Sequence, residues 1–174
     1  MGLKDVIAEL DRIRSAGLVT DYAVGGAVAA GVYIEVGSTL DIDVFVLLGG
    51  AHGSPLAPLG PVWADLVAHG AKEEDGYLVI GDWPVQLLMG KPLVDEAVSR
   101  ARVTHVEGMD TRIMSPEYLA AIALDTGRLK DHLRVEEFIR RARIDMPVFL
   151  ELVDRFELAD RWQAFQRKFL ETDG

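Results

Sequence analysis

Apolar residues recur along the chain with two different periods, and the change from one to the other divides the sequence. In the first two thirds, short runs typical of strands alternate with runs at helical spacing. In the last third only helical spacing occurs. The pattern predicts an α/β (α+β) fold, with a sheet-containing core over residues 1–114 and a helical C-terminal segment over residues 115–174 packed on it.

The strand signals are short apolar or alternating runs bounded by glycine, proline or charged residues. They predict strands at residues 22–24, 41–48, 77–80, 83–89 and 112–114. The run at 41–48 is apolar on both faces after its aspartates, which favours a central strand. Gly81-Asp82 lies between two of the runs and predicts a hairpin turn.

The helix signals are apolar residues three and four positions apart, together with start and stop residues. They predict helices at residues 3–13, 27–34, 62–69 and 93–102, and a loop at 49–61. Ser115-Pro116-Glu117 combines an N-cap residue, a first-turn proline and a first-turn acid, so it predicts the start of the helical segment. Further helix starts are expected near residues 129, 145–147 and 158.

Composition and charge narrow the classes of function. The 174 residues include no cysteine, so disulfides and thiolate metal sites are excluded and a cytoplasmic protein is expected. No apolar run reaches the roughly 18 residues of a membrane span, so no membrane partner is expected. The net charge of −10 disfavours extended DNA binding, but it leaves room for a small nucleotide whose charge is met locally.

The candidate chemistry lies in Gly25-Gly26 and Asp41-Ile42-Asp43. Two aspartates two positions apart on a strand share one face, where like charges repel, and a divalent cation between them would remove the conflict. Oxygen ligands favour Mg²⁺ or Mn²⁺. Alternatively, Asp41 caps a turn and Asp43 is solvated. The glycine pair before a helix predicts a tight turn whose N–H groups are suited to phosphate.

These residues resemble the DNA polymerase β-type nucleotidyltransferase superfamily, in particular its small bacterial members, the abortive-infection toxin-like and minimal nucleotidyltransferases. Gly25-Gly26 is similar to the family's glycine motif, and Thr39-Leu40-Asp41-Ile42-Asp43 to its acidic motif. The segments 115–119 and 126–131 are similar to the helical pair that follows the family's core. The resemblance covers about residues 20–135 and implies a nucleotidyltransferase-like mixed sheet flanked by helices.

The resemblance also implies roles for individual residues. Asp41 and Asp43 would hold Mg²⁺, which bridges the phosphates of a nucleoside triphosphate and activates an acceptor hydroxyl. Gly25 and Gly26 would receive the outer phosphates, and Ser38 or Thr39 would add a hydrogen bond. The acceptor, whether a small molecule, a protein or an RNA, is not specified by the sequence.

Lys130 and Asp131 lie in a segment that concentrates basic residues in an otherwise acidic chain. Lys130 and Arg134 are four residues apart and therefore share a helix face. One interpretation places this face over the site, with Lys130 offsetting phosphate charge and Asp131 as a further catalytic candidate. The other is a solvated helix whose bases pair with Glu136, Glu137 and Asp125.

The sequence departs from the family pattern at two positions. Gly37 stands where an arginine is frequent, and Gln86 stands on the strand that usually carries a third carboxylate. An amide accepts a metal contact but cannot take up a proton as a general base. Asp82, Glu35 and Asp131 are the alternative acids.

Two hypotheses follow. The first is a Mg²⁺-dependent nucleotidyltransferase that transfers a nucleotidyl group to a hydroxyl acceptor. The second is a non-catalytic binding protein with the same fold, such as a toxin–antitoxin component.

Overall fold

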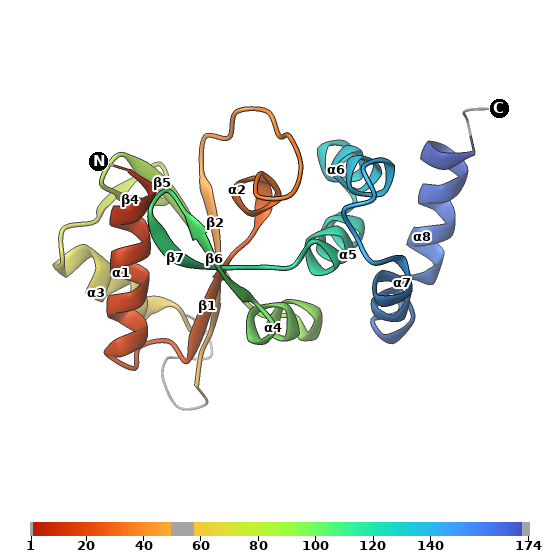
Figure 1. Cartoon of the computed structure of the whole chain (residues 1–174). Coiled ribbons are helices and arrows are strands. Elements are labelled where there is room, and N and C mark those ends of the chain that lie inside the picture. The colour runs from red at the N-terminus through yellow and green to blue at the C-terminus, as the bar shows by residue number, and fades with distance from the viewer. Residues whose placement is uncertain (1, 50–57, 172–174) are drawn as a thin grey trace.

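The strands form one mixed sheet in the computed structural model, which describes residues 2–49 and 58–171 (Figure 1). The spatial order is β3-β4-β5-β2-β1-β7-β6. The bounds are β1 Asp21–Val24, β2 Ile42–Leu47, β3 Lys72–Glu74, β4 Tyr77–Ile80, β5 Trp83–Leu88, β6 Arg102–Val106 and β7 Met109–Ile113. The pairs β2–β5 and β1–β7 are parallel and the others antiparallel, so the predicted mixed sheet is confirmed.

Helices cover both faces of this sheet. The bounds are α1 Leu3–Ser15, α2 Gly26–Ala30, α3 Gly60–Ala68, α4 Pro92–Ser99, α5 Pro116–Thr126, α6 Leu129–Arg140, α7 Met146–Arg155 and α8 Ala159–Phe165, followed by a π-helical turn at Gln166–Leu170. In Figure 1, α1 and α3 lie on one side of the sheet, and α2, α4 and the later helices lie on the other. Within the described ranges, no helix has the length and hydropathy of a membrane span.

The predicted elements with strong periodicity are confirmed. The apolar face of α1 is fully buried, and Gly17 follows the helix end with a φ of 75°. Ile80 pairs with Trp83 across the Gly81-Asp82 turn, as the hairpin prediction required. Pro116 lies in the first turn of α5, directly after the N-cap Ser115.

Several predicted bounds were wrong, and two strands were not predicted. The helix expected at 93–102 ends at Ser99, because β6 begins at Arg102 and forms a hairpin with β7 through Glu107-Gly108, both of which have positive φ. β3 is an exposed polar edge strand without alternation, joined to β4 through Asp75-Gly76. The helix expected at 27–34 spans only Gly26–Ala30. Within the loop expected at 49–61, residues 50–57 lie outside the described residues, and Gly60 already begins α3.

An ion-pair cluster joins the core to the helices that follow it. Glu96 of α4 accepts hydrogen bonds from Arg155 of α7, at 3.0 Å to Oε2 and 2.5 Å to Oε1, and from the Tyr118 hydroxyl of α5. These donors hold the pKa of Glu96 below its ordinary value. Lys91 Nζ lies 2.6 Å from Asp125 Oδ2 and adds a second link between the end of the core and α5. The division of the chain at residue 114 stays a prediction.

We expect Glu96→Gln to lower the free energy of unfolding at neutral pH by about 1 kcal/mol, because it removes the charge that orients Arg155 and Tyr118. The folded-state pKa of Glu96 is lowered, so this stabilisation is present above the ordinary glutamate pKa and is lost as pH falls through the folded-state value. Urea unfolding at neutral and acid pH measures the difference.

The matched control is Glu151→Gln, which removes a more exposed carboxylate beside the same arginine. It should change stability much less than Glu96→Gln. An equal effect of the two variants at neutral pH would contradict the assignment.

Candidate functional site

The glycine pair lets the chain turn tightly over the central strand. β1 ends at Val24, and the chain enters α2 through Gly25 and Gly26. Gly26 has a φ of +56°, and a Cβ there would lie 2.8 Å from Cγ of Asp43. The Gly25 N–H donates to the Asp43 carbonyl oxygen at 2.9 Å, and a Cβ at Gly25 would lie 2.7 Å from Cδ2 of Phe45. Close approach to β2 therefore requires both glycines.

The two aspartates differ in their surroundings. Asp41 lies directly before β2, where Thr39 Oγ1 donates to its carbonyl oxygen at 3.0 Å and lies 3.3 Å from its Oδ1. Asp43 is within β2, between the neighbouring strands β1 and β5. Burial raises the pKa of Asp43, and the negative charge of Asp41 raises it further. The ionised pair is therefore unfavourable unless positive charge is nearby.

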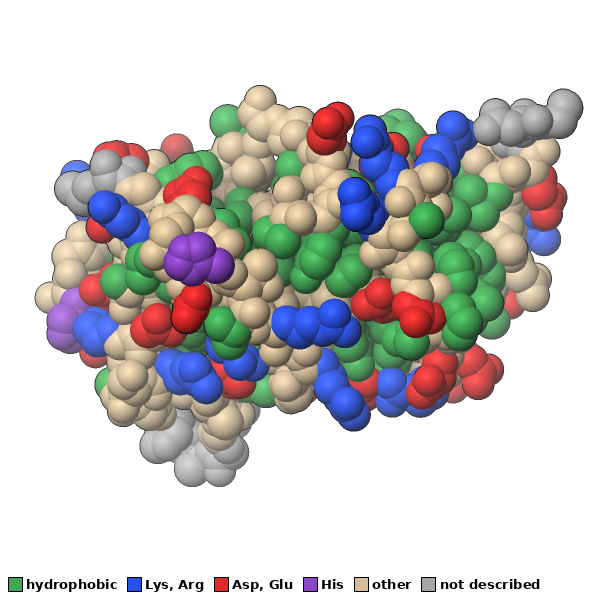
Figure 2. All heavy atoms as spheres, in the orientation of Figure 1, with side chains coloured by type: hydrophobic (Ala, Val, Ile, Leu, Met, Phe, Trp, Pro, Cys, Tyr) green, Lys and Arg blue, Asp and Glu red, His purple; other side chains and the backbone are tan. Residues whose placement is uncertain are grey.

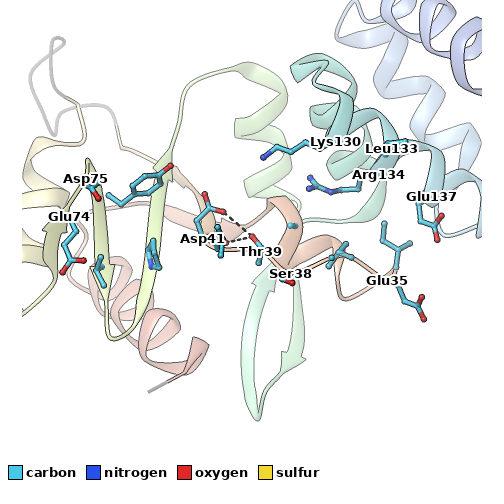
Figure 3. Close-up of a pocket in the computed structure, with 18 residues that line it drawn as sticks. Glu35, Ser38, Thr39, Asp41, Glu74, Asp75, Lys130, Leu133, Arg134 and Glu137 are labelled. Atoms are coloured by element: carbon cyan, nitrogen blue, oxygen red, sulfur yellow. Dashed lines mark hydrogen bonds between the residues drawn. The ribbon is translucent and has the colours of Figure 1, made fainter.

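A cavity of about 870 Å³ opens beside Asp41 (Figure 3). The loop before β2 contributes Ser38 and Thr39 to its lining, and the β3–β4 turn contributes Glu74 and Asp75. Helix α6 lies on the opposite side, with its basic side chains directed toward Asp41. In Figure 2, basic side chains lie over α6, and hydrophobic side chains lie between α6 and the sheet.

The structure brings some of the predicted site residues together at this cavity. Those that line it are Ser38, Thr39, Asp41 and Lys130. Gly25, Gly26, Asp43 and Gln86 are not among the residues that line it. Asp43 lies against Gly26, and its neighbour in the parallel register of β5 is Gln86. The roles predicted for these residues stay predictions.

Asp131, unlike Lys130 beside it in the sequence, lies away from the cavity. It does not line the cavity, and only 2% of the residue is exposed. Its Oδ2 accepts from Arg128 Nε at 2.6 Å. Its predicted direct catalytic role therefore has no support from its position.

Arg134 is a basic residue of the cavity that was not among the predicted site residues. It lines the cavity beside Lys130, and 17% of its side chain is exposed. Arg134, Arg128 and Lys130, in that order, lower the pKa of Asp43 and so oppose the effect of burial. The signal in the sequence was the four-residue spacing of Lys130 and Arg134.

The candidate metal ligands at this site are the carboxylates of Asp41, which lines the cavity, and Asp43, which lies against Gly26. Among the described residues, no group of three or more His, Cys, Asp or Glu side chains is arranged to hold a metal. The protein therefore offers the carboxylates of Asp41 and Asp43. Mg²⁺ is commonly bound by one or two carboxylates, with water and substrate phosphates as the remaining ligands.

Comparisons with solved structures define the fold. An antigenic nucleotidyltransferase-like protein from Paracoccidioides brasiliensis matches with a TM-score of 0.61 and 13% identity, over 95% of this chain and 88% of that one. The antibiotic-resistance factor ANT(2'')-Ia matches with a TM-score of 0.51 and 15% identity, over 96% and 97% of the two chains. No protein-family model and no curated protein matches the sequence. The chain has a nucleotidyltransferase-like α+β fold.

We expect Gly26→Ala to lower the free energy of unfolding by about 1–3 kcal/mol, because alanine is strained at positive φ and its Cβ would displace Asp43. Thermal or urea unfolding measures the loss. Gly37→Ala is the control, since an added Cβ at Gly37 would have no atom within 4 Å. Equal stability of the two variants would contradict the close-approach argument.

We expect Asp43→Asn to raise the melting temperature of the metal-free protein at neutral pH. The folded-state pKa of Asp43 is raised, so its contribution to stability is complete below the ordinary aspartate pKa and is lost as pH rises through the folded-state value. The rise in melting temperature of Asp43→Asn over the wild type should therefore grow as pH increases from the ordinary aspartate pKa to the folded-state pKa of Asp43. Below the ordinary pKa the two proteins should melt alike. Melting curves across a pH series measure it.

Asp110→Asn is the control for this series, because Asp110 is an exposed carboxylate on β7. Its melting temperature should follow that of the wild type at each pH. A loss of stability in Asp43→Asn at neutral pH without metal would overturn the expectation.

Proposed function

We propose that this chain is a Mg²⁺-dependent nucleotidyltransferase that binds a nucleoside triphosphate in the cavity between β2 and α6. The observation that carries the proposal is the position of the acid pair. Asp41 lines the cavity, Asp43 is partly buried two residues further along against Gly26, and Lys130 and Arg134 of α6 lie opposite Asp41. The nucleotidyltransferase-like fold of the whole chain supports the same conclusion.

The chemistry assigns each group a role. The acceptor hydroxyl releases its proton to water, its oxygen bonds to the α-phosphorus while the bond to the bridging oxygen breaks, and pyrophosphate leaves. Asp41 and Asp43 would hold a metal ion, which when bound neutralises phosphate charge and lowers the pKa of the acceptor hydroxyl. Lys130 would offset charge on the departing pyrophosphate. Ser38 would donate a hydrogen bond to a phosphate oxygen, or Thr39 would do so after exchanging its bond to the Asp41 carbonyl oxygen.

The glycine turn would hold the outer phosphates. Gly25 and Gly26 form the turn into α2, whose second residue, Ala27, lines the cavity, and backbone N–H groups are suited to anions when a loop presents them together. The N–H of Gly25 already donates to the Asp43 carbonyl, so the later amides are the ones left for a ligand.

The acceptor is proposed to be a small, positively charged molecule with a hydroxyl group. The cavity wall opposite α6 carries Glu74 and Asp75, which would attract a cation. The net charge of −10 disfavours an RNA acceptor. One structural neighbour, ANT(2'')-Ia, is an antibiotic-resistance factor, which agrees with a small-molecule acceptor.

A second candidate function is nucleotide binding without transfer, as in one half of a toxin–antitoxin pair. Gln86 supports it, since this amide is the register neighbour of Asp43 on β5 and cannot accept a proton. The two candidates share the nucleotide and metal site and differ only in turnover.

The test is transfer of label from α-labelled nucleoside triphosphates, in Mg²⁺, to a panel of cationic and neutral hydroxyl compounds. We expect the Asp41→Asn/Asp43→Asn variant to lose transfer by about a thousandfold or more, because the metal contributes several kcal/mol to the transition state. Asp110→Asn should retain the wild-type rate, because Asp110 lies on the exposed β6–β7 hairpin.

Binding distinguishes the remaining outcomes. A rise in melting temperature with Mg²⁺ and nucleotide, without label transfer, would favour the non-catalytic candidate. No rise and no transfer would exclude both candidates. Transfer that persists in the double variant would exclude the acid pair as the metal ligands.

A further inference from the structure

Asp131 lies in the first turn of α6, buried between two arginines. Arg128, three residues before it, donates to Oδ2 through Nε at 2.6 Å and to Oδ1 through Nη2 at 3.3 Å. Arg134, three residues after it, has Nη1 3.7 Å from Oδ1. One carboxylate therefore contacts two guanidinium groups on the same helix.

These two arginines differ in their exposure and in their position relative to the cavity. Arg134 is largely covered and lines the cavity, whereas Arg128 has 60% of its side chain exposed and is not among the lining residues. Both nevertheless act on the acid pair, since each lowers the pKa of Asp43. Figure 3 shows Arg134 extending from α6 into the cavity beside Lys130.

A guanidinium group has five N–H donors in a planar fork. The contact of Arg134 with Asp131 through Nη1 leaves other donors for a ligand in the cavity. A side chain held in this way has already lost part of its rotational freedom, so less affinity is lost when a ligand binds.

We propose that Asp131 is a positioning residue that orients Arg134 toward the triphosphate, and that Arg134 makes the contact. The proposal rests on the proposed function, because it names the residues that hold the phosphates of the same site. It gives Asp131 an indirect role in place of the direct catalytic one expected from the sequence.

The test measures binding of Mg²⁺-tripolyphosphate to the full chain by titration calorimetry. Arg134→Gln should weaken binding about tenfold, because it removes the charge-assisted hydrogen bond to a phosphate oxygen. Asp131→Asn should weaken binding to a similar extent, because it removes the contact that orients Arg134. The double variant should bind within about twofold of Arg134→Gln alone, because Asp131 acts only through that arginine.

The matched control is Glu136→Gln on the same helix. Glu136 Oε1 lies 2.7 Å from Arg140 Nη2, so the variant removes an equivalent ion pair that is not at the cavity. Its affinity should equal that of the wild type. A purely structural role of Asp131 would lower the melting temperature of Asp131→Asn while leaving the affinity of the folded protein unchanged, which would overturn the proposal.

Arg134→Lys provides a second variant that does not alter the buried carboxylate. Lysine keeps the charge but lacks the planar fork, so binding should weaken nearly as much as in Arg134→Gln. Wild-type affinity in Arg134→Lys, or additive losses in the double variant, would overturn the proposal even if Asp131→Asn failed to fold.

Binding of Mg²⁺-tripolyphosphate by the wild type distinguishes a failure of this proposal from a failure of the proposed function. If the wild type binds no Mg²⁺-tripolyphosphate, the proposed function fails and the role of Asp131 fails with it. If the wild type binds, and Asp41→Asn/Asp43→Asn does not, the site is supported and the variants of α6 test Asp131 alone.

Discussion

The carboxylate of Asp43 lies against Gly26 and beside Asp41, and the surrounding structure depends on this contact. It leaves no space for a side chain at Gly26 and requires a tight turn between β1 and α2. Burial and the neighbouring charge of Asp41 both oppose ionisation of Asp43. Positive charge is therefore needed close by, and among the described residues it comes from the first turns of α6. A bound cation would meet the same need.

The helices after residue 115 are consequently part of the site. α6 supplies Lys130 and Arg134 to one wall of the cavity, while the sheet and its loops supply the opposite wall. Away from the cavity, Glu96 ties α4 to α5 and α7 through Tyr118 and Arg155. These interactions fix α5 and α7 to the core, and α6, which carries Lys130 and Arg134, packs against α5.

The parts of the fold that follow from the sequence are those determined locally. The Gly81-Asp82 hairpin and the apolar face of α1 depend on neighbouring residues, so their patterns predicted them. β3 carries only exposed Lys and Glu side chains, and its pairing with β4 gives no apolar signal. Helical spacing showed that Lys130 and Arg134 share a face. It could not show which face meets the cavity, because the orientation of α6 is set by the burial of Val135 and Phe138 in the core.

The amide of Gln86 has an electrostatic consequence for the whole site. A carboxylate at this register position would add a third negative charge beside Asp43, whose ionisation is already opposed by burial and by Asp41. With an amide there, the negative side chains at this position are the two carboxylates of Asp41 and Asp43. Under the proposed function, Lys130 and Arg134 would meet part of the charge of a triphosphate. The N-cap residue Arg128 and the first two turns of α6, with Lys130 and Arg134, supply positive charge on this side of Asp43.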